Sequence, residues 1–88
     1  MRHIADESFW NAYEKLSAST QKQADAAFAL LKANPYHPSL HFKRLRNTGR
    51  WSVRVGLHFR AVSEQADKEL FVWFWIGTHA EYDHVIRE

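Results

Sequence analysis

Arg54, Arg60 and His79 are the residues of this chain whose types and positions best suit chemistry. Guanidinium groups bind phosphate oxygens through paired, charge-assisted hydrogen bonds. Histidine is the side chain whose ordinary pKa, about 6.5, suits proton transfer near neutrality. Tyr82 follows His79 by three residues, which is close to one helical turn, so both side chains could face one cleft. We therefore treat these four residues as a candidate catalytic group.

Alternating apolar and polar residues predict two half-buried antiparallel strands around the two arginines. The apolar series that would pack under the helices is Trp51, Val53, Val55, Leu57, Phe59 and Ala61. Because successive strand residues point to opposite faces, Arg54, His58 and Arg60 would share the other face. A tight or bulged turn is expected near Gly56 and Leu57.

The last strand would contribute aromatic rings to the same face as these arginines. Leu70 to Ile76 is apolar on both faces, which is typical of a central strand. It would add either Phe71, Trp73 and Trp75 or Val72, Phe74 and Ile76 to that face. A cationic surface with rings suits single-stranded RNA, because arginines hold phosphates and rings stack on unpaired bases. The alternative is that Arg54 and Arg60 are ordinary exposed residues paired with Glu64 or Glu69.

His79 is expected in the first turn of a short C-terminal helix. Gly77 would end the preceding strand, and Thr78 with Glu81 has capping-box spacing. A helix N-terminus offers unpaired amide groups that favour a nearby anion such as phosphate. The alternatives are that His79 only hydrogen-bonds the helix start and that Tyr82 packs as plain core.

Basic residues are concentrated in the middle of the chain, although the net charge is only +2. No acidic residue occurs between Asp25 and Glu64, a segment with seven lysines and arginines. Clustered cations attract polyanions, so this segment favours a nucleic-acid partner, with a solvated basic face as the alternative. The candidate substrate-binding residues are Lys43, Arg44, Arg46 and His58.

The remaining segments predict an α+β fold. Helical spacing indicates one helix over residues 6–17 and a second that begins at Thr20 and ends at Asn34-Pro35, together forming an antiparallel helical hairpin. A loop over residues 35–41, short strands at 2–5 and 42–45, and a polar hairpin turn at 65–68 complete the pattern. We expect the helical hairpin to pack on a small antiparallel sheet, followed by the short C-terminal helix.

Length and composition restrict the class of protein. Eighty-eight residues suffice for one domain, so we expect a single domain over residues 1–88. No apolar run reaches the roughly 20 residues that span a bilayer, and no signal peptide is evident, so we expect a cytoplasmic protein without membrane contact. The chain has no cysteine, and His79 with Asp83 lacks a third ligand, so we expect no metal and no cofactor.

The sequence resembles the RelE/ParE superfamily, the toxins of bacterial type II toxin–antitoxin pairs. The likeness covers nearly the whole chain in order and spacing, through FWNAYEKL, QADAAFALLKANPYHPSLHFKRL, WSVRVGLHFRAV and VWFWIGTHAEYDHVI. These segments are similar to a RelE-like subgroup. Ser52 departs from the pattern, because some members have a second cation near Arg54 at that position.

This resemblance implies a function, partners and site residues. RelE-like members cleave mRNA on the ribosome, where contacts to ribosomal RNA are expected, and a cognate antitoxin neutralises them. By position, Arg54 and Arg60 match the family's strand cations, His79 the residue after the last strand's glycine, and Tyr82 the nearby aromatic. The resemblance therefore implies a metal-independent endoribonuclease. Its alternative is a ParE-like inhibitor of DNA gyrase without nuclease activity.

Overall fold

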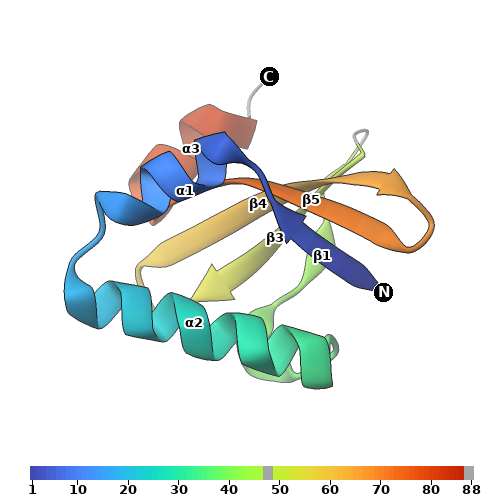
Figure 1. The fold of residues 1–88 in the computed structure, drawn as a ribbon, viewed down its shortest axis with the longest axis horizontal. Helices are drawn as coiled ribbons and strands as arrows, with labels where there is room; N and C mark the ends of the chain where they lie inside the picture. Colours follow the sequence, from blue (N-terminus) through green and yellow to red (C-terminus); the bar gives the residue numbers. More distant parts are fainter. Residues whose placement is uncertain (47–48, 87–88) are drawn as a thin grey trace.

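A computed structural model describes residues 1–46 and 49–86 of the chain, and it has five strands, three α-helices and one short 3₁₀ helix (Figure 1). In chain order they are β1 (Arg2–Ala5), α1 (Glu7–Glu14), α2 (Ala18–Ala33), η1 (Pro38–Leu40), β2 (Lys43–Arg44), β3 (Arg50–Val55), β4 (Phe59–Asp67), β5 (Leu70–Thr78) and α3 (His79–Ile86). The predicted α+β class, with two N-terminal helices, a small sheet and a short C-terminal helix, is confirmed. No helix within the described residues is long and apolar enough to cross a membrane.

Side-chain caps fix where α1 and α2 begin. The Phe9 amide donates to Asp6 Oδ1 at 3.0 Å, and the Thr20 amide donates to Ser17 Oγ at 3.2 Å. The second helix therefore begins at Ala18 and not at the predicted Thr20, because Ser17 supplies the capping oxygen. Thr20 is instead buried inside the helix.

The sheet has the order β1-β5-β4-β3-β2. Its four strands from β2 to β5 pair antiparallel, as expected, whereas β1 pairs parallel with the first half of β5. The parallel arrangement of β1 was not predicted, because residues 2–5 give no signal of strand direction. The Trp73 indole N–H donates to Nδ1 of His3 at 3.0 Å and so helps to hold β1 in the sheet. Burial, then the N-terminal ammonium and Lys32, lower the pKa of His3, which favours the neutral ring that can accept this bond.

The hairpin turn predicted near Gly56 and Leu57 is confirmed, whereas the turn predicted at residues 65–68 is displaced toward the C-terminus. The turn between β3 and β4 contains Gly56 with a φ of +60°, and Leu57 lies in it with 76% of its surface exposed, so Leu57 does not join the core series. Residues 65–67 belong to β4, and the second turn lies at residues 68–69.

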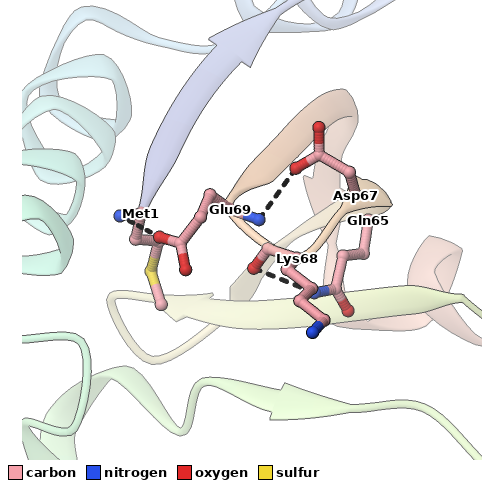
Figure 2. Close-up of polar contacts among 5 residues, drawn as sticks. All are labelled: Met1, Gln65, Asp67, Lys68 and Glu69. Atoms are coloured by element: carbon pink, nitrogen blue, oxygen red, sulfur yellow. Dashed lines mark hydrogen bonds and ion pairs between the residues drawn. The ribbon is translucent and has the colours of Figure 1, made fainter.

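Side chains of β4 support the turn between β4 and β5 (Figure 2). The Glu69 amide donates to Asp67 Oδ1 at 2.8 Å, and Gln65 Nε2 donates to the Lys68 carbonyl at 3.4 Å. The Glu69 carboxylate forms an ion pair with the N-terminal ammonium of Met1 at 2.7 Å. The start of β1 is thereby tied to this turn.

The core lies between the sheet and helices α1 and α2, whereas α2 and α3 lie on opposite sides of the sheet (Figure 1). β5 buries Phe71, Trp73 and Ile76 on the helix-covered side, a combination that neither predicted alternation contains. The register explains the difference, because Val62 pairs with Trp75 and Ser63 with Trp73, which leaves Phe74 as an extra residue. This bulge reverses the alternation in the middle of β5.

An apolar groove opens between α1 and α2. The two helices diverge from the turn that joins them (Figure 1). Its volume is about 300 Å³, and its floor is formed by core side chains of β3, β4 and β5. Ile4, Trp10 and Phe28 line it while leaving 53%, 49% and 41% of their surfaces exposed. Tyr13 and Gln21 join the helices at their near ends, through bonds from Tyr13 Oη to Asp25 and from Gln21 Nε2 to the Tyr13 carbonyl.

Candidate active site

Arg54 and Arg60 lie directly opposite one another on β3 and β4. Directly paired residues of antiparallel strands share a face, and both neighbours of Arg54, Val53 and Val55, are buried in the core. The two guanidinium groups therefore share the face turned away from α1 and α2, as the alternation predicted. Like charges in this arrangement repel each other and destabilise the pair.

Neither arginine has an acidic partner within the described part of the chain. Both side chains are half-buried; Arg54 Nε is buried without a hydrogen-bond partner, and Arg60 Nη1 reaches only the carbonyl of Phe59 at 3.5 Å. Glu69, one of the two acids considered as a partner, binds the N-terminus instead. The arrangement leaves two cations side by side with capacity to bind an anion.

Helix α3 packs on the same face through Tyr82. This residue retains 6% of its surface exposed, and its hydroxyl donates to Oγ of the buried Ser52 at 3.2 Å. The ring of His79 is stacked on the Tyr82 ring with centroids 6.0 Å apart, and the Arg60 guanidinium carbon lies 5.9 Å from the Tyr82 centroid. Tyr82 thus joins the candidate acid–base residue to one of the candidate phosphate-binding residues.

The predicted capping box at the start of α3 is present. The Thr78 amide donates to Glu81 Oε1 at 3.0 Å, and the Glu81 amide donates to Thr78 Oγ1 at 3.2 Å. The His79 amide donates to the carbonyl of His58 at 2.8 Å. The expectation of unpaired amides for a phosphate is therefore wrong for residues 78, 79 and 81, and anion binding here depends on the arginine side chains.

Gly77 has a different role from the predicted strand end. It lies within β5, which continues to Thr78. An ideal Cβ at residue 77 would lie 2.5 Å from Trp75 Cζ2 and 2.8 Å from Glu81 Oε1. Glycine is required because the Trp75 ring and the capping carboxylate both approach the backbone closely.

The predicted substrate-binding residues are distributed around this face rather than gathered on it. Lys43 pairs with Ser52, so it lies on the Arg54 side of the sheet, at the outer edge. His58 is exposed in the turn beside His79. Arg44 pairs with Trp51 and so lies on the opposite side, and Arg46 is exposed in the turn after β2. The fold therefore brings Lys43 to the face of Arg54 and places His58 next to His79.

Two residues of this face were not selected from the sequence. Arg50 Nη1 donates to the Val85 carbonyl near the end of α3 at 3.2 Å, and its guanidinium carbon lies 5.5 Å from the Phe74 ring. Ser52 accepts the Tyr82 hydroxyl bond. Alternation from Arg54 places both on the same face, but nothing in the sequence shows that α3 returns to cover them. The described residues include no cluster of three histidine or acidic side chains that could hold a metal ion.

Comparisons with known proteins identify relatives of this fold. Residues 18–84 match a family model described as a ParE-like toxin domain. A YoeB/ParE toxin from Agrobacterium tumefaciens superposes with a TM-score of 0.68 at 19% identity, covering 90% of this chain and 99% of that one. YafQ from E. coli gives a TM-score of 0.71 at 16% identity, with coverages of 92% and 96%.

A third solved structure is the RelB-RelE antitoxin-toxin complex from Methanococcus jannaschii. One of its chains superposes with a TM-score of 0.72 at 10% identity, covering 94% of this chain and 98% of that one. A search of curated protein sequences gives no match. At these identities the structural likeness shows a shared fold, while the family model carries the evolutionary relationship.

The capping box predicts how α3 responds to acid. Hydrogen bonds from the amide and then the hydroxyl of Thr78 lower the pKa of Glu81 below its ordinary value of 4.5. The charged carboxylate therefore stabilises α3 fully above pH 4.5, and this contribution is lost as the pH falls through the lower, folded-state pKa. We expect the ¹H–¹⁵N signals of Thr78 and His79 to shift along one titration curve in that acidic range.

Glu81→Gln is the matched control for this titration, because glutamine keeps capping-box geometry without a titrating charge. Its Thr78 and His79 signals should stay constant over the same range. An equal acid shift in the Gln variant would show that another group is responsible.

Proposed function

We propose that this protein is the toxin of a toxin–antitoxin pair and that it cleaves mRNA on the ribosome. The chain belongs to the ParE-like toxin domain family and thus to the RelE/ParE superfamily, and the proposal starts from that membership. The observation that carries the nuclease proposal is the Arg54–Arg60 pair, two arginines at directly paired strand positions without an acidic partner within the described residues. We further propose that residues 1–88 form one toxin domain that acts in the cytoplasm, where ribosomes and mRNA are found.

The chemistry that this face supports is attack of an RNA 2′-hydroxyl on the adjacent phosphate. The new bond joins the 2′-oxygen to phosphorus while the bond to the 5′-oxygen breaks, giving a 2′,3′-cyclic phosphate and a free 5′-hydroxyl. A protein assists this reaction by transferring protons, by stabilising the extra negative charge and by holding an in-line geometry. RNA supplies its own nucleophile, so no nucleophilic side chain is needed.

Arg54 and Arg60 suit charge stabilisation. Their side chains start from directly paired backbone positions, so one phosphate can receive hydrogen bonds from both. Binding of an anion relieves the repulsion between them, and more charge on the phosphate in the transition state strengthens the interaction. Half-burial of both side chains lowers the local dielectric and increases this effect.

His79 suits proton transfer. Its side chain is exposed at the start of α3, and its ring lies against Tyr82, which also contacts Arg60. A phosphate bound to the arginines would therefore lie close to an accessible imidazole. Lys43 and His58, at the edges of the same region, can contact the flanking RNA.

A cognate antitoxin is the partner that we propose for the groove between α1 and α2. Three of the similar solved structures are described as RelB-RelE or RelBE toxin–antitoxin complexes. The groove leaves Ile4, Trp10 and Phe28 partly exposed, and such patches mark protein interaction sites. His3 Nε2 lies buried at this groove without a partner, so an antitoxin segment with apolar side chains and one hydrogen-bond acceptor would fit it.

A ParE-like gyrase inhibitor remains the second candidate, because the matching family model carries the ParE name. The two candidates differ in what induced expression does to a cell. A nuclease leaves cut transcripts within minutes, whereas a gyrase inhibitor raises a DNA-damage response and leaves transcripts intact.

Substitution of the catalytic group tests the nuclease proposal. We expect Arg54→Ala, Arg60→Ala and His79→Ala each to lower cleavage of ribosome-bound mRNA by about 100-fold or more, the usual cost of losing a charge-stabilising or proton-transferring group. Mapping of transcript ends on programmed ribosomes measures this. Lys22→Ala, which removes an exposed cation from α2, should retain parental cleavage. Parental activity in His79→Ala and Arg54→Ala would refute the assignment.

A charge placed at the groove tests the proposed antitoxin site. Phe28→Glu should weaken binding of the adjacent reading frame's product by about 10-fold or more, because a buried carboxylate without a partner costs at least 1.4 kcal/mol. Tyr36→Glu is the matched control, since Tyr36 is 83% exposed and lies outside the groove. Calorimetric titration measures both affinities, and equal affinities would place the antitoxin elsewhere.

A further inference from the structure

The hydrogen bond between Tyr82 and Ser52 connects α3 to the middle of β3. Ser52 retains 1% and Tyr82 6% of its surface exposed, so both hydroxyl groups lie away from solvent. The Tyr82 hydroxyl donates to Ser52 Oγ at 3.2 Å. Each hydroxyl would carry a desolvation cost if the other were removed. The bond therefore restricts the position of the Tyr82 ring more narrowly than packing alone.

Tyr82 also contacts the two residues on which proton transfer and charge stabilisation depend. The His79 ring lies nearly parallel to the Tyr82 ring, at 27° with centroids 6.0 Å apart. The Arg60 guanidinium carbon lies 5.9 Å from the centroid of that ring, within cation–π range. A rotation or translation of the Tyr82 ring would thus change the separation of His79 and Arg60.

The rest of α3 is held by contacts that do not involve this hydroxyl pair. The capping box fixes the first turn, and Arg50 binds the Val85 carbonyl near the last turn. The helix can therefore remain docked when the bond between Ser52 and Tyr82 is lost. Loss of this bond can therefore move the Tyr82 ring while α3 stays on the sheet.

We infer that Ser52 and Tyr82 are positioning residues whose hydrogen bond sets the placement of His79 relative to Arg60. The inference rests on the proposed RNA cleavage, and it gives Tyr82 a role inside the protein instead of at the reacting atoms. Ser52, which stands where some relatives have a cation, then contributes by holding the ring that both functional side chains touch.

Removing either hydroxyl tests this inference. Ser52→Ala and Tyr82→Phe should each lower the single-turnover cleavage rate by about 3- to 10-fold, the equivalent of one net hydrogen bond. The double variant should lose no more than the larger single loss, because both changes remove one interaction. Ser52→Thr, which keeps the hydroxyl, should recover most of the rate.

A second readout does not depend on cleavage. The NMR signals of the His79 imidazole and the Arg60 Nε–H group should shift in Ser52→Ala and Tyr82→Phe, since the Tyr82 ring shields both. Tyr13→Phe is the matched control, because it removes a tyrosine hydroxyl bond of 2.8 Å to Asp25 on the other side of the sheet. It should leave both the two signals and the cleavage rate unchanged.

The outcomes separate this inference from the proposed function. Unchanged His79 and Arg60 signals in Ser52→Ala and Tyr82→Phe would overturn the positioning role, as would parental cleavage rates in both variants. If the signals shift while the parent itself cleaves no RNA, the proposed function fails and the structural part of the inference holds.

Discussion

The repulsion between Arg54 and Arg60 is the interaction on which the account of this protein depends. The two arginines occupy directly paired positions on adjacent strands, where like charges destabilise a sheet, and no acid within the described residues neutralises them. The hydrophobic core on the other side of the same strands holds them in register, with Val53, Val55 and Ala61 buried under the helices. The core thus maintains an unfavourable charge arrangement that an anion would make favourable.

Much of the fold followed from sequence patterns that act locally. Alternation placed Arg54 and Arg60 on one face because Val53, Val55 and Ala61 occupy the other. The spacing of Thr78 and Glu81 identified the capping box, since both partners lie within one helical turn. Other features depend on tertiary contacts and could not be read in this way. The bulge at Phe74 reverses the alternation of β5, and the parallel pairing of β1 joins segments about seventy residues apart.

Sequence patterns selected the candidate site residues, but they did not show how the fold arranges them. Arg54, Arg60 and His79 could be selected by type and position, whereas the part played by Ser52 appears only when α3 is seen to return across β3. Tyr82 illustrates the same limit of local patterns. Its spacing from His79 indicated a shared helical face, but its burial and its bond to Ser52 are consequences of packing.

The groove and the arginine pair lie on opposite sides of the sheet. Trp10 and Phe28 belong to the side that carries α1 and α2, whereas Arg54 and Arg60 belong to the side that carries α3. An antitoxin segment confined to the groove would therefore leave the arginine face open. Neutralisation by direct coverage requires a second segment that reaches around the sheet, and an acidic segment would complement the charge there.

The most direct measurement is a titration of ¹⁵N-labelled protein with a short RNA whose 2′-hydroxyl at the scissile position is replaced by hydrogen. The account predicts that the Nε–H signals of Arg54 and Arg60 shift together, with one apparent affinity that falls as salt is raised. Shifts confined to exposed cations such as Lys22 and Arg46, with the signals of Arg54 and Arg60 unmoved, would contradict it.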